Sequence, residues 1–212
     1  RELARKARYV VMAVKPYQIE ALLAEMAPEF GPDTVVISVA AGISIARLQA
    51  AVAGRCPVVR CMPNTPALVG KGVFALCFDD KVPAESKEDI LRFFSQLGVC
   101  LELPESRFTA FSALIGAGPA YVFGMMQGLV QAGVTLGLGR KDCRDMVAAL
   151  FEGSAVMAAR SDTPLMELRD QVCSPGGLTI AGVNVLDRAG LSGLLVDAVL
   201  AADERGREME KE

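Results

Sequence analysis

The sequence predicts an α/β protein, in which a doubly wound, mostly parallel sheet is followed by an all-helical part. As far as Leu103, short continuous apolar runs alternate with amphipathic stretches, a pattern typical of buried parallel strands separated by helices. Beyond Pro104 the apolar residues follow a helical period over longer stretches. We therefore expect two domains, one over residues 1–103 with the sheet and one over 104–212 that is helical.

The elements of the first domain follow from the length of each run. Buried strands are short and apolar on both faces, and they stop where glycine, proline or polar residues begin. On this basis, strands are expected at 9–14, 35–39, 57–62, 72–78 and 99–103. Between them, amphipathic periods predict helices at 18–27, 45–52 and 85–96.

The second domain is expected to contain six helices. Pro119 and Pro164 fit the first turn of a helix, where a missing N–H does no harm, and Gly190 fits a stop. The predicted helices cover 105–114, 119–136, 140–159, 164–172, 178–189 and 191–210.

The helix after Pro119 is apolar nearly all round, as in a helix that is buried on every side. Glycines at 124, 128 and 133 lower helix propensity, which suggests close contact with another helix or a ligand. Apolar residues on the later helices also need cover, so we expect this part to pair with a second copy of the chain.

Composition excludes several classes of function. The chain is 52% hydrophobic with a net charge of −3 and a pI of about 5.2, and its charges of both signs are interspersed. Nothing in this pattern favours binding to nucleic acid or to an anionic membrane surface. The first eight residues are too charged for the core of a secretory signal, so a cytoplasmic protein is expected.

The chain has no histidine, and its six cysteines include no Cys-x-x-Cys pair. A metal site is therefore not expected, and the cysteines are interpreted as small buried residues in a reducing compartment. Without histidine, the usual acid–base and triad chemistries are also absent. Hydride transfer to an already activated double bond remains, because a nicotinamide cofactor carries the difficult step.

Three groups of small residues follow the first three predicted strands. In a doubly wound sheet, ligands bind beyond the carboxyl ends of the parallel strands. Each group alone is also compatible with ordinary loop punctuation, but three on one edge favour a cofactor cleft. The groups are Val14-Lys15-Pro16, Ala40-Ala41-Gly42 and Pro63-Asn64-Thr65.

The stretch from Val172 to Asp187 is the expected site of the chemistry. Pro175 ends a preceding helix, Gly176-Gly177 permits a tight turn, and a new helix starts at Leu178. The first N–H groups of that helix have no internal partner, so they can hold a small carboxylate without a basic side chain. The alternative is purely structural, with Ser174 as a helix N-cap and the glycines as a turn.

These residues resemble the signature of the pyrroline-5-carboxylate reductases, a Ser-Pro-Gly-Gly-x-Thr turn that enters a helix. Four further stretches are similar to motifs of that family, in the family's order, so the resemblance spans almost the whole chain. They are Ala13-Val14-Lys15-Pro16, Val39-Ala40-Ala41-Gly42-Ile43, Arg60-Cys61-Met62-Pro63-Asn64-Thr65-Pro66 and Gly116-Ala117-Gly118-Pro119-Ala120-Tyr121.

The resemblance implies a Rossmann-like fold and the reduction of pyrroline-5-carboxylate to L-proline, with NADPH or NADH, by a homodimer joined through its helical half. It implies Thr179 and Ser174 as catalytic residues, with the ring nitrogen beside the Thr179 hydroxyl. The implied substrate-binding residues are Ser174, Gly176, Gly177, Leu178 and Thr179. The implied cofactor-binding residues are Ala13, Val14, Lys15, Pro16, Val39, Ala41, Asn64 and Gln171.

The sequence departs from the family pattern in three places. Ala117 replaces a serine, and Gln171 stands where relatives often have asparagine. The glycine-rich βαβ unit with which the family begins is not found before Arg1, so the sheet is expected to be N-terminally incomplete by roughly 50–60 residues. The residue that selects NAD or NADP belongs to that unit, so the preference is not readable.

Two alternative functions stay open. A dehydrogenase of the wider β-hydroxyacid type would have a similar sheet followed by helices, but it normally needs a helical lysine or similar acid at the site. A non-catalytic oligomer that has lost its phosphate-binding half would explain the absent βαβ unit.

Overall fold

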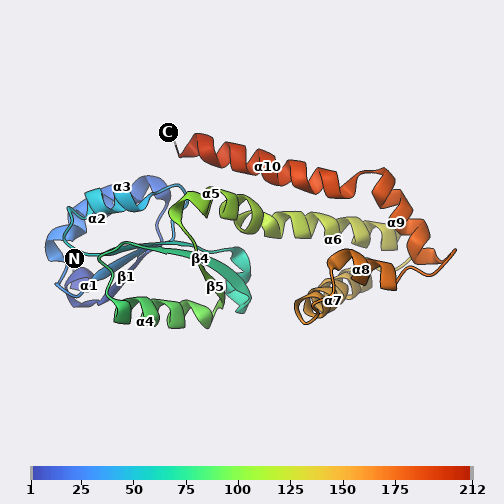
Figure 1. The fold of residues 1–212 in the computed structure, drawn as a ribbon, viewed down its shortest axis with the longest axis horizontal. Coiled ribbons are helices and arrows are strands. Elements are labelled where there is room, and N and C mark those ends of the chain that lie inside the picture. Colours follow the sequence, from blue (N-terminus) through green and yellow to red (C-terminus); the bar gives the residue numbers. More distant parts are fainter. Residues whose placement is uncertain (1, 211–212) are drawn as a thin grey trace. The chain divides into compact units, whose positions relative to one another are not determined.

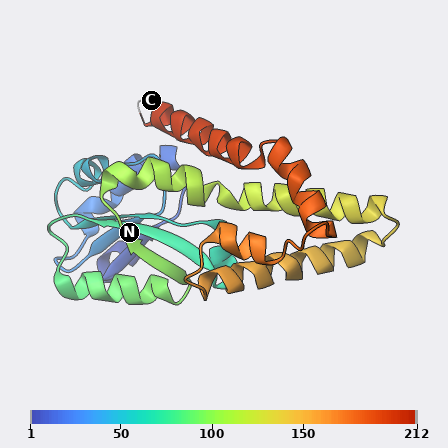
Figure 2. The same cartoon turned by 45° about the vertical axis from the view of Figure 1, so that its right-hand side comes forward.

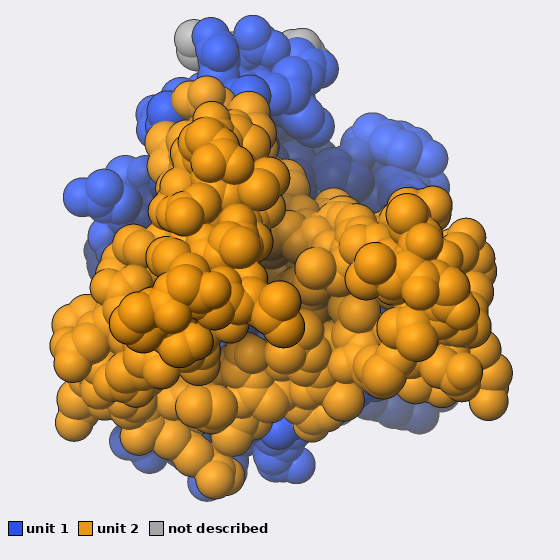
Figure 3. Space-filling model, turned by 90° about the vertical axis from the view of Figure 1, so that its right-hand side faces the viewer, with its two compact units in different colours: residues 1–119, 199–212 blue, residues 120–198 orange. Residues whose placement is uncertain are grey.

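The structure, a computed structural model, describes residues 2–210. It divides into two compact units, one of residues 1–119 with 199–212 and the other of residues 120–198 (Figure 3). The boundary expected at Pro104, between the sheet domain and the helical domain, does not coincide with the boundaries of these compact units. It stays a prediction.

The first unit contains a five-stranded sheet with the strands in sequence order. The strands are β1 (Tyr9–Met12), β2 (Val35–Ser38), β3 (Val58–Met62), β4 (Gly72–Phe78) and β5 (Gly98–Glu102). β1, β2 and β3 are parallel, as are β4 and β5, so the predicted mostly parallel sheet is confirmed. β4 is antiparallel to β3 because the link 63–71 is shorter than the dozen or so residues that a parallel crossover needs.

Helices cover both faces of this sheet (Figure 1). On one face, α2 (Pro16–Met26) and α3 (Ile45–Ala51) contribute Ile19, Leu23 and Leu48 to a core with Val10 and Val36. On the other face, α4 (Ala84–Ser95) packs on β2, β3 and β4. All four residues of β2 are buried, and the first three are apolar, as is typical of a parallel strand covered on both faces.

Several short elements have no signal in the apolar pattern. They are the charged helix α1 (Glu2–Lys6) and the 3-10 turns η1 (Ala27–Glu29), η2 (Thr65–Val69) and η3 (Glu105–Arg107). Each spans at most five residues, which is too short for a helical period to be read.

The helical part follows the prediction closely except at its start. The predicted helix 105–114 is instead η3, the short helix α5 (Phe108–Phe111) and a π-helical turn, η4 (Ser112–Gly116). The π turn forms because the Ala117 N–H donates to the Ser112 carbonyl, 2.9 Å away and five residues back. The remaining helices are α6 (Gly118–Thr135), α7 (Arg140–Ala159), α8 (Leu165–Gln171), α9 (Leu178–Arg188) and α10 (Leu191–Met209).

The second unit has a small core for its apolar content. Val130, Cys143 and Val147 are buried where α6 meets α7, the antiparallel pair in Figure 2. α8, α9 and α10 contain no buried residue among those described. Large apolar side chains are exposed on every helix of the unit, including Phe123, Leu150, Leu165, Leu178 and Leu194.

One helical stretch, Glu105–Thr135, is also long and apolar enough to cross a membrane. Its mean hydropathy reaches 1.4 over 18 residues, of which 11% are buried within the chain. An exposed apolar surface of this extent marks a site of interaction.

Candidate functional site

The loops that follow β1, β2 and β3 lie at one edge of the sheet. The strands are parallel, with Met12 opposite Ser38 and Ser38 opposite Arg60, so their carboxyl ends come together. This edge, which we call the cofactor edge, is formed by the loops that begin after Met12, Ser38 and Met62. It brings together the predicted cofactor-binding residues Ala13, Val14, Lys15, Pro16, Val39, Ala41 and Asn64.

The first two of these loops present small, accessible side chains. Ala13, Val14, Lys15 and Ala41 are exposed, whereas Val39 is half-buried and its N–H donates to the Met12 carbonyl (3.2 Å). A flat ligand could therefore approach the backbone at the ends of β1 and β2 closely. This surface fits part of a dinucleotide, because few side chains stand over it.

Asn64 is held by two hydrogen bonds within the protein. Its side-chain oxygen accepts from the Val73 N–H (2.9 Å), and its amide nitrogen donates to the Ile115 carbonyl (3.3 Å). One amide N–H remains for a ligand. The side chain therefore ties together the loop after β3, the start of β4 and the π turn.

The turn between α8 and α9, residues 172–177, has the geometry expected from its sequence. The Gly177 N–H donates to the Ser174 carbonyl (3.0 Å), and Gly176 has a φ of +68°, which favours glycine. Gly177 is the N-cap of α9, with an extended backbone. The prediction of Ser174 as N-cap is therefore wrong, the predicted turn at the glycines is present, and no side-chain hydrogen bond caps this helix.

The N-terminus of α9 offers several free donors. The N–H groups of Leu178, Thr179 and Ile180 have no hydrogen-bond acceptor within residues 2–210. The Ser174 and Thr179 side chains are exposed beside them, and Leu178 is 95% exposed. Because the helix dipole is positive here, this end of α9 can bind a carboxylate.

Residues of α8 flank the same turn. Gln171 ends the helix and is exposed. Arg169 forms ion pairs with Asp170 (3.2 Å) and with Asp187 of α9 (3.3 Å), so its charge is already balanced by two carboxylates. The hydrogen bond to Asp170 raises the pKa of Arg169. A carboxylate at this turn therefore depends on backbone N–H groups and hydroxyls, as the sequence predicts.

We expect Gly177→Ala to weaken substrate binding through Ser174. A Cβ at position 177 would lie 2.2 Å from the Ser174 Oγ and 3.2 Å from the Ser174 carbonyl oxygen, so the serine side chain must rotate away. Loss of one hydrogen bond to a carboxylate would raise the KM for the substrate by about ten- to a hundredfold. Steady-state kinetics of Gly177→Ala, Ser174→Ala and the double variant test whether Gly177→Ala acts by displacing the Ser174 side chain. Equal KM values are expected in all three variants. A higher KM in the double variant than in Ser174→Ala would contradict this explanation.

The prediction of buried cysteines holds for three of the six, and the other three are half-buried. All six are free, and Cys56, Cys61 and Cys143 are buried. Burial raises the pKa of Cys56 to about 11 and that of Cys61 to about 12. These two thiols are therefore protonated at neutral pH and are poor nucleophiles. Within the described residues, no group of three His, Cys, Asp or Glu side chains is placed to hold a metal ion.

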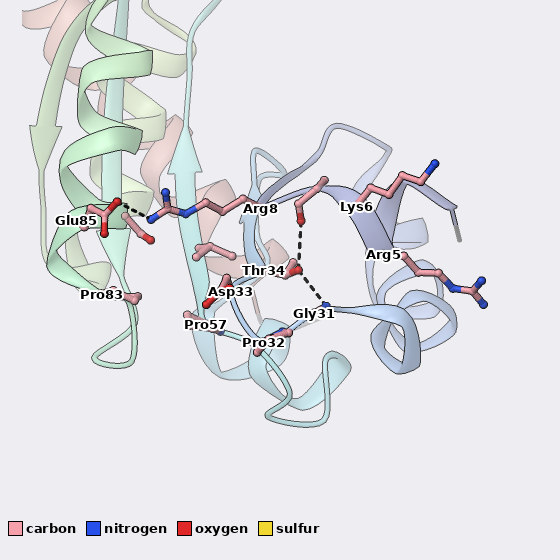
Figure 4. Close-up of a pocket in the computed structure, with 13 residues that line it drawn as sticks. Arg5, Lys6, Arg8, Gly31, Pro32, Asp33, Thr34, Pro57, Pro83 and Glu85 are labelled. Carbon is pink, nitrogen blue, oxygen red and sulfur yellow. Dashed lines mark hydrogen bonds and ion pairs between the residues drawn. The ribbon is translucent and has the colours of Figure 1, made fainter.

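A cavity of about 650 Å³ lies at the other edge of the sheet, where β1, β2 and β3 begin (Figure 4). Its polar groups largely satisfy one another. Arg8 pairs with Glu85 (3.2 Å), and the Thr34 hydroxyl donates to the Ala7 carbonyl while accepting from the Gly31 N–H. The predicted site residues are at the opposite edge of this sheet or in the second unit, so this cavity is not the candidate site.

Arg60 is a charged residue inside the sheet to which the sequence pattern assigns no role. The Arg60 side chain is 6% exposed and pairs with Glu105 (3.0 Å) and Glu210 (3.5 Å). Its signal in the sequence is a single charge within the apolar run of β3. A buried charge needs partners, but spacing alone does not identify them.

Comparison with known proteins identifies the family. Residues 105–209 match the family model described as pyrroline-5-carboxylate reductase dimerisation. The pyrroline-5-carboxylate reductases of Corynebacterium melassecola and Pseudomonas aeruginosa are 38% and 37% identical to the chain, covering 99% and 98% of it and 79% and 77% of their own lengths.

A crystal structure of Plasmodium falciparum pyrroline carboxylate reductase with NADP bound superimposes with a TM-score of 0.91 at 34% identity. The match covers 99% of this chain and 79% of that one. The chain belongs to the pyrroline-5-carboxylate reductase family.

Proposed function

We propose that the protein reduces pyrroline-5-carboxylate to L-proline with NADPH or NADH. The observation that carries this proposal is the turn at Ser174–Gly177, which leaves backbone donors and two hydroxyls at the start of α9. It occurs in a chain that is 38% identical, over 99% of its length, to a pyrroline-5-carboxylate reductase.

The substrate carboxylate would bind at the N-terminus of α9. Ser174, Gly176 and Gly177 shape the turn, and the N–H groups of Leu178 and Thr179 point out of the helix end without an internal acceptor. The Thr179 hydroxyl, in the first turn of α9, orients the ring nitrogen and donates or relays its proton. Because the chain has no histidine for the usual acid–base chemistry, these residues contribute chiefly by positioning the substrate.

The cofactor would lie against the cofactor edge. A bound reduced nicotinamide supplies the hydride for the imine carbon. Of the chain's residues, Val39 and the exposed Ala13, Val14, Lys15 and Ala41 offer a flat surface, and Pro16 starts α2 beside them. Asn64 lies in the loop after β3, and Gln171, in the second unit, stays a predicted cofactor ligand. Apart from Gln171, these assignments make residues 1–103 the cofactor-binding part and residues 104–212 the part that binds substrate and a partner.

The helical part would form a homodimer. The family model that matches residues 105–209 describes dimerisation, and those residues carry most of the uncovered apolar surface. Met146, Leu150 and Met157 make an exposed apolar stripe on α7, spaced as i, i+4 and i+11. A second copy would cover such stripes and the apolar stretch 105–135, which favours a cytoplasmic dimer over insertion into a membrane.

An assay of the purified product of the full open reading frame tests the proposed function. We expect consumption of NADPH or NADH that depends on pyrroline-5-carboxylate, with one L-proline formed for each cofactor oxidised. Absence of turnover in a folded protein that binds the reduced cofactor would favour a non-catalytic oligomer. Turnover of a β-hydroxyacid but not of the imine would assign the protein to the wider dehydrogenase group.

A further inference from the structure

The buried arginine of β3 joins three segments that are far apart in the sequence. The Arg60 guanidinium lies over the Phe108 ring, with 4.6 Å between the Cζ atom and the ring centroid. From there it pairs with Glu105, at the start of the helical part, and with Glu210, beyond the end of α10. All these residues belong to the first unit, so the cluster links parts of one compact body.

Glu105 connects this cluster to the loop after β2. The Glu105 Oε1 atom that accepts from Arg60 also accepts from the Ile45 N–H (2.7 Å), at the first position of α3. Ser44 caps the same helix through the Arg47 N–H (3.2 Å). The end of the loop that contains Ala41 is therefore fixed partly by a carboxylate that Arg60 holds in place.

Asn64 anchors the other end of the same helical segment. The Ile115 carbonyl that accepts from Asn64 lies in the π turn, and a Cβ at Gly116 would come within 3.1 Å of the Met62 side chain. Segment 105–116 is thus attached to the end of β3 at both ends, by an ion pair at Glu105 and by an amide hydrogen bond at Ile115.

The end of α10 closes the cluster. The Thr109 hydroxyl donates to Glu210 (2.8 Å), and a Cβ at Gly206 would lie 2.7 Å from the Thr109 methyl group. The helix end therefore packs tightly against α5, which keeps the second carboxylate beside Arg60.

We propose that Arg60 and Asn64 are positioning residues that clamp segment 105–116 onto the end of β3. Through this clamp they fix two of the three loops of the cofactor edge, the loop after β2 by way of Glu105 and the loop after β3 by way of Asn64. The proposal rests on the proposed function for the identity of the ligand, NADPH or NADH. It gives Asn64 a role different from direct contact with the cofactor.

Two variants separate the anchors. Asn64→Asp keeps an acceptor for the Val73 N–H but removes the donor to the Ile115 carbonyl, and Arg60→Met removes the ion pairs while filling similar space. Arg60→Lys keeps a charge and is the conservative variant. Arg47→Met is the matched control, because Arg47 is an arginine close to the same cluster whose exposed side chain pairs with Glu20.

The measurements are the dissociation constant for NADPH by titration calorimetry, the KM values for both substrates, kcat, and the melting temperature, all on the product of the full open reading frame. We expect Asn64→Asp and Arg60→Met each to raise the dissociation constant for NADPH about tenfold, with Arg60→Lys in between. The KM for pyrroline-5-carboxylate should change by less than about twofold. Arg47→Met should bind NADPH as the parent protein does.

The double variant Asn64→Asp/Arg60→Met shows whether the two anchors act by one route. If both act through segment 105–116, its dissociation constant should rise by less than the product of the two single effects. A full product would mean that the two anchors act independently of each other and would overturn the shared clamp. Unchanged NADPH affinity with a lowered melting temperature would overturn positioning altogether. Because NADPH binding is measured without turnover, a failure of the proposed reaction in the parent protein remains distinguishable.

Discussion

Replacing Thr179 by alanine is expected to lower turnover about ten- to a hundredfold while leaving the fold unchanged. The side chain is exposed at the second position of α9, so its loss removes no internal packing. In a chain without histidine, this hydroxyl is the side-chain group best placed to contact the substrate nitrogen as its charge changes during reduction. A contact that strengthens in the transition state affects kcat, and the expected loss is that of a hydrogen bond to a charged group.

Ser174→Ala is the matched control for this prediction. Carboxylate binding by Ser174 and the backbone donors acts about equally on bound substrate and transition state, so this change should raise KM with little effect on kcat. Steady-state kinetics with pyrroline-5-carboxylate and saturating cofactor measure both variants. Wild-type kcat and catalytic efficiency in Thr179→Ala would leave the turn as a carboxylate-binding helix end and nothing more.

Leu150→Asp combined with Leu194→Asp is expected to convert the proposed homodimer into monomers at micromolar concentration. Both leucines are more than half exposed in the single chain and lie within the region matched to the dimerisation model. Each buried leucine stabilises an interface by about 1.5–3 kcal/mol, and an unpaired carboxylate in its place adds a desolvation penalty. In a twofold dimer each substitution occurs twice in the interface, so its destabilising effect is doubled.

Sedimentation velocity with circular dichroism distinguishes dissociation from unfolding. Phe93→Asp is the control, because Phe93 is 56% exposed on α4 and lies outside the matched region. The control should remain dimeric. A parent protein that sediments as a folded monomer, or a double aspartate variant that remains a dimer, would contradict a dimer built on these helices.

Elements whose signal is local could be predicted from the sequence. The strands β1, β2 and β3 are short, largely apolar runs, so they and the loops after them were predictable, and so was their shared edge. The direction of β4 was not, because its run resembles that of a parallel strand and only the short link 63–71 reverses it. The π turn could not be predicted from the sequence either, since a single wider turn leaves the apolar period almost unchanged.

The features that could not be predicted depend on contacts between residues that are far apart in the sequence. A lone charge in β3 indicated that Arg60 must have partners, but Glu105 and Glu210 are 45 and 150 positions further along the chain. Asn64 was interpreted as a cofactor ligand from its place after β3, and its bonds to Val73 and Ile115 depend on how β4 and the π turn pack. The structure also shows that Gly177, and not Ser174, is the N-cap of α9.

The central claim, reduction of a cyclic imine by hydride, is tested most directly by following deuterium. Pyrroline-5-carboxylate and NADPH that carries deuterium on nicotinamide C4 would be incubated with the product of the full open reading frame, and the proline analysed by mass spectrometry and NMR. The protein should form L-proline with deuterium at ring carbon 5 from one of the two C4 epimers, and undeuterated proline from the other. Proline that lacks deuterium with both epimers, or no proline from a folded protein that binds the cofactor, would contradict the account.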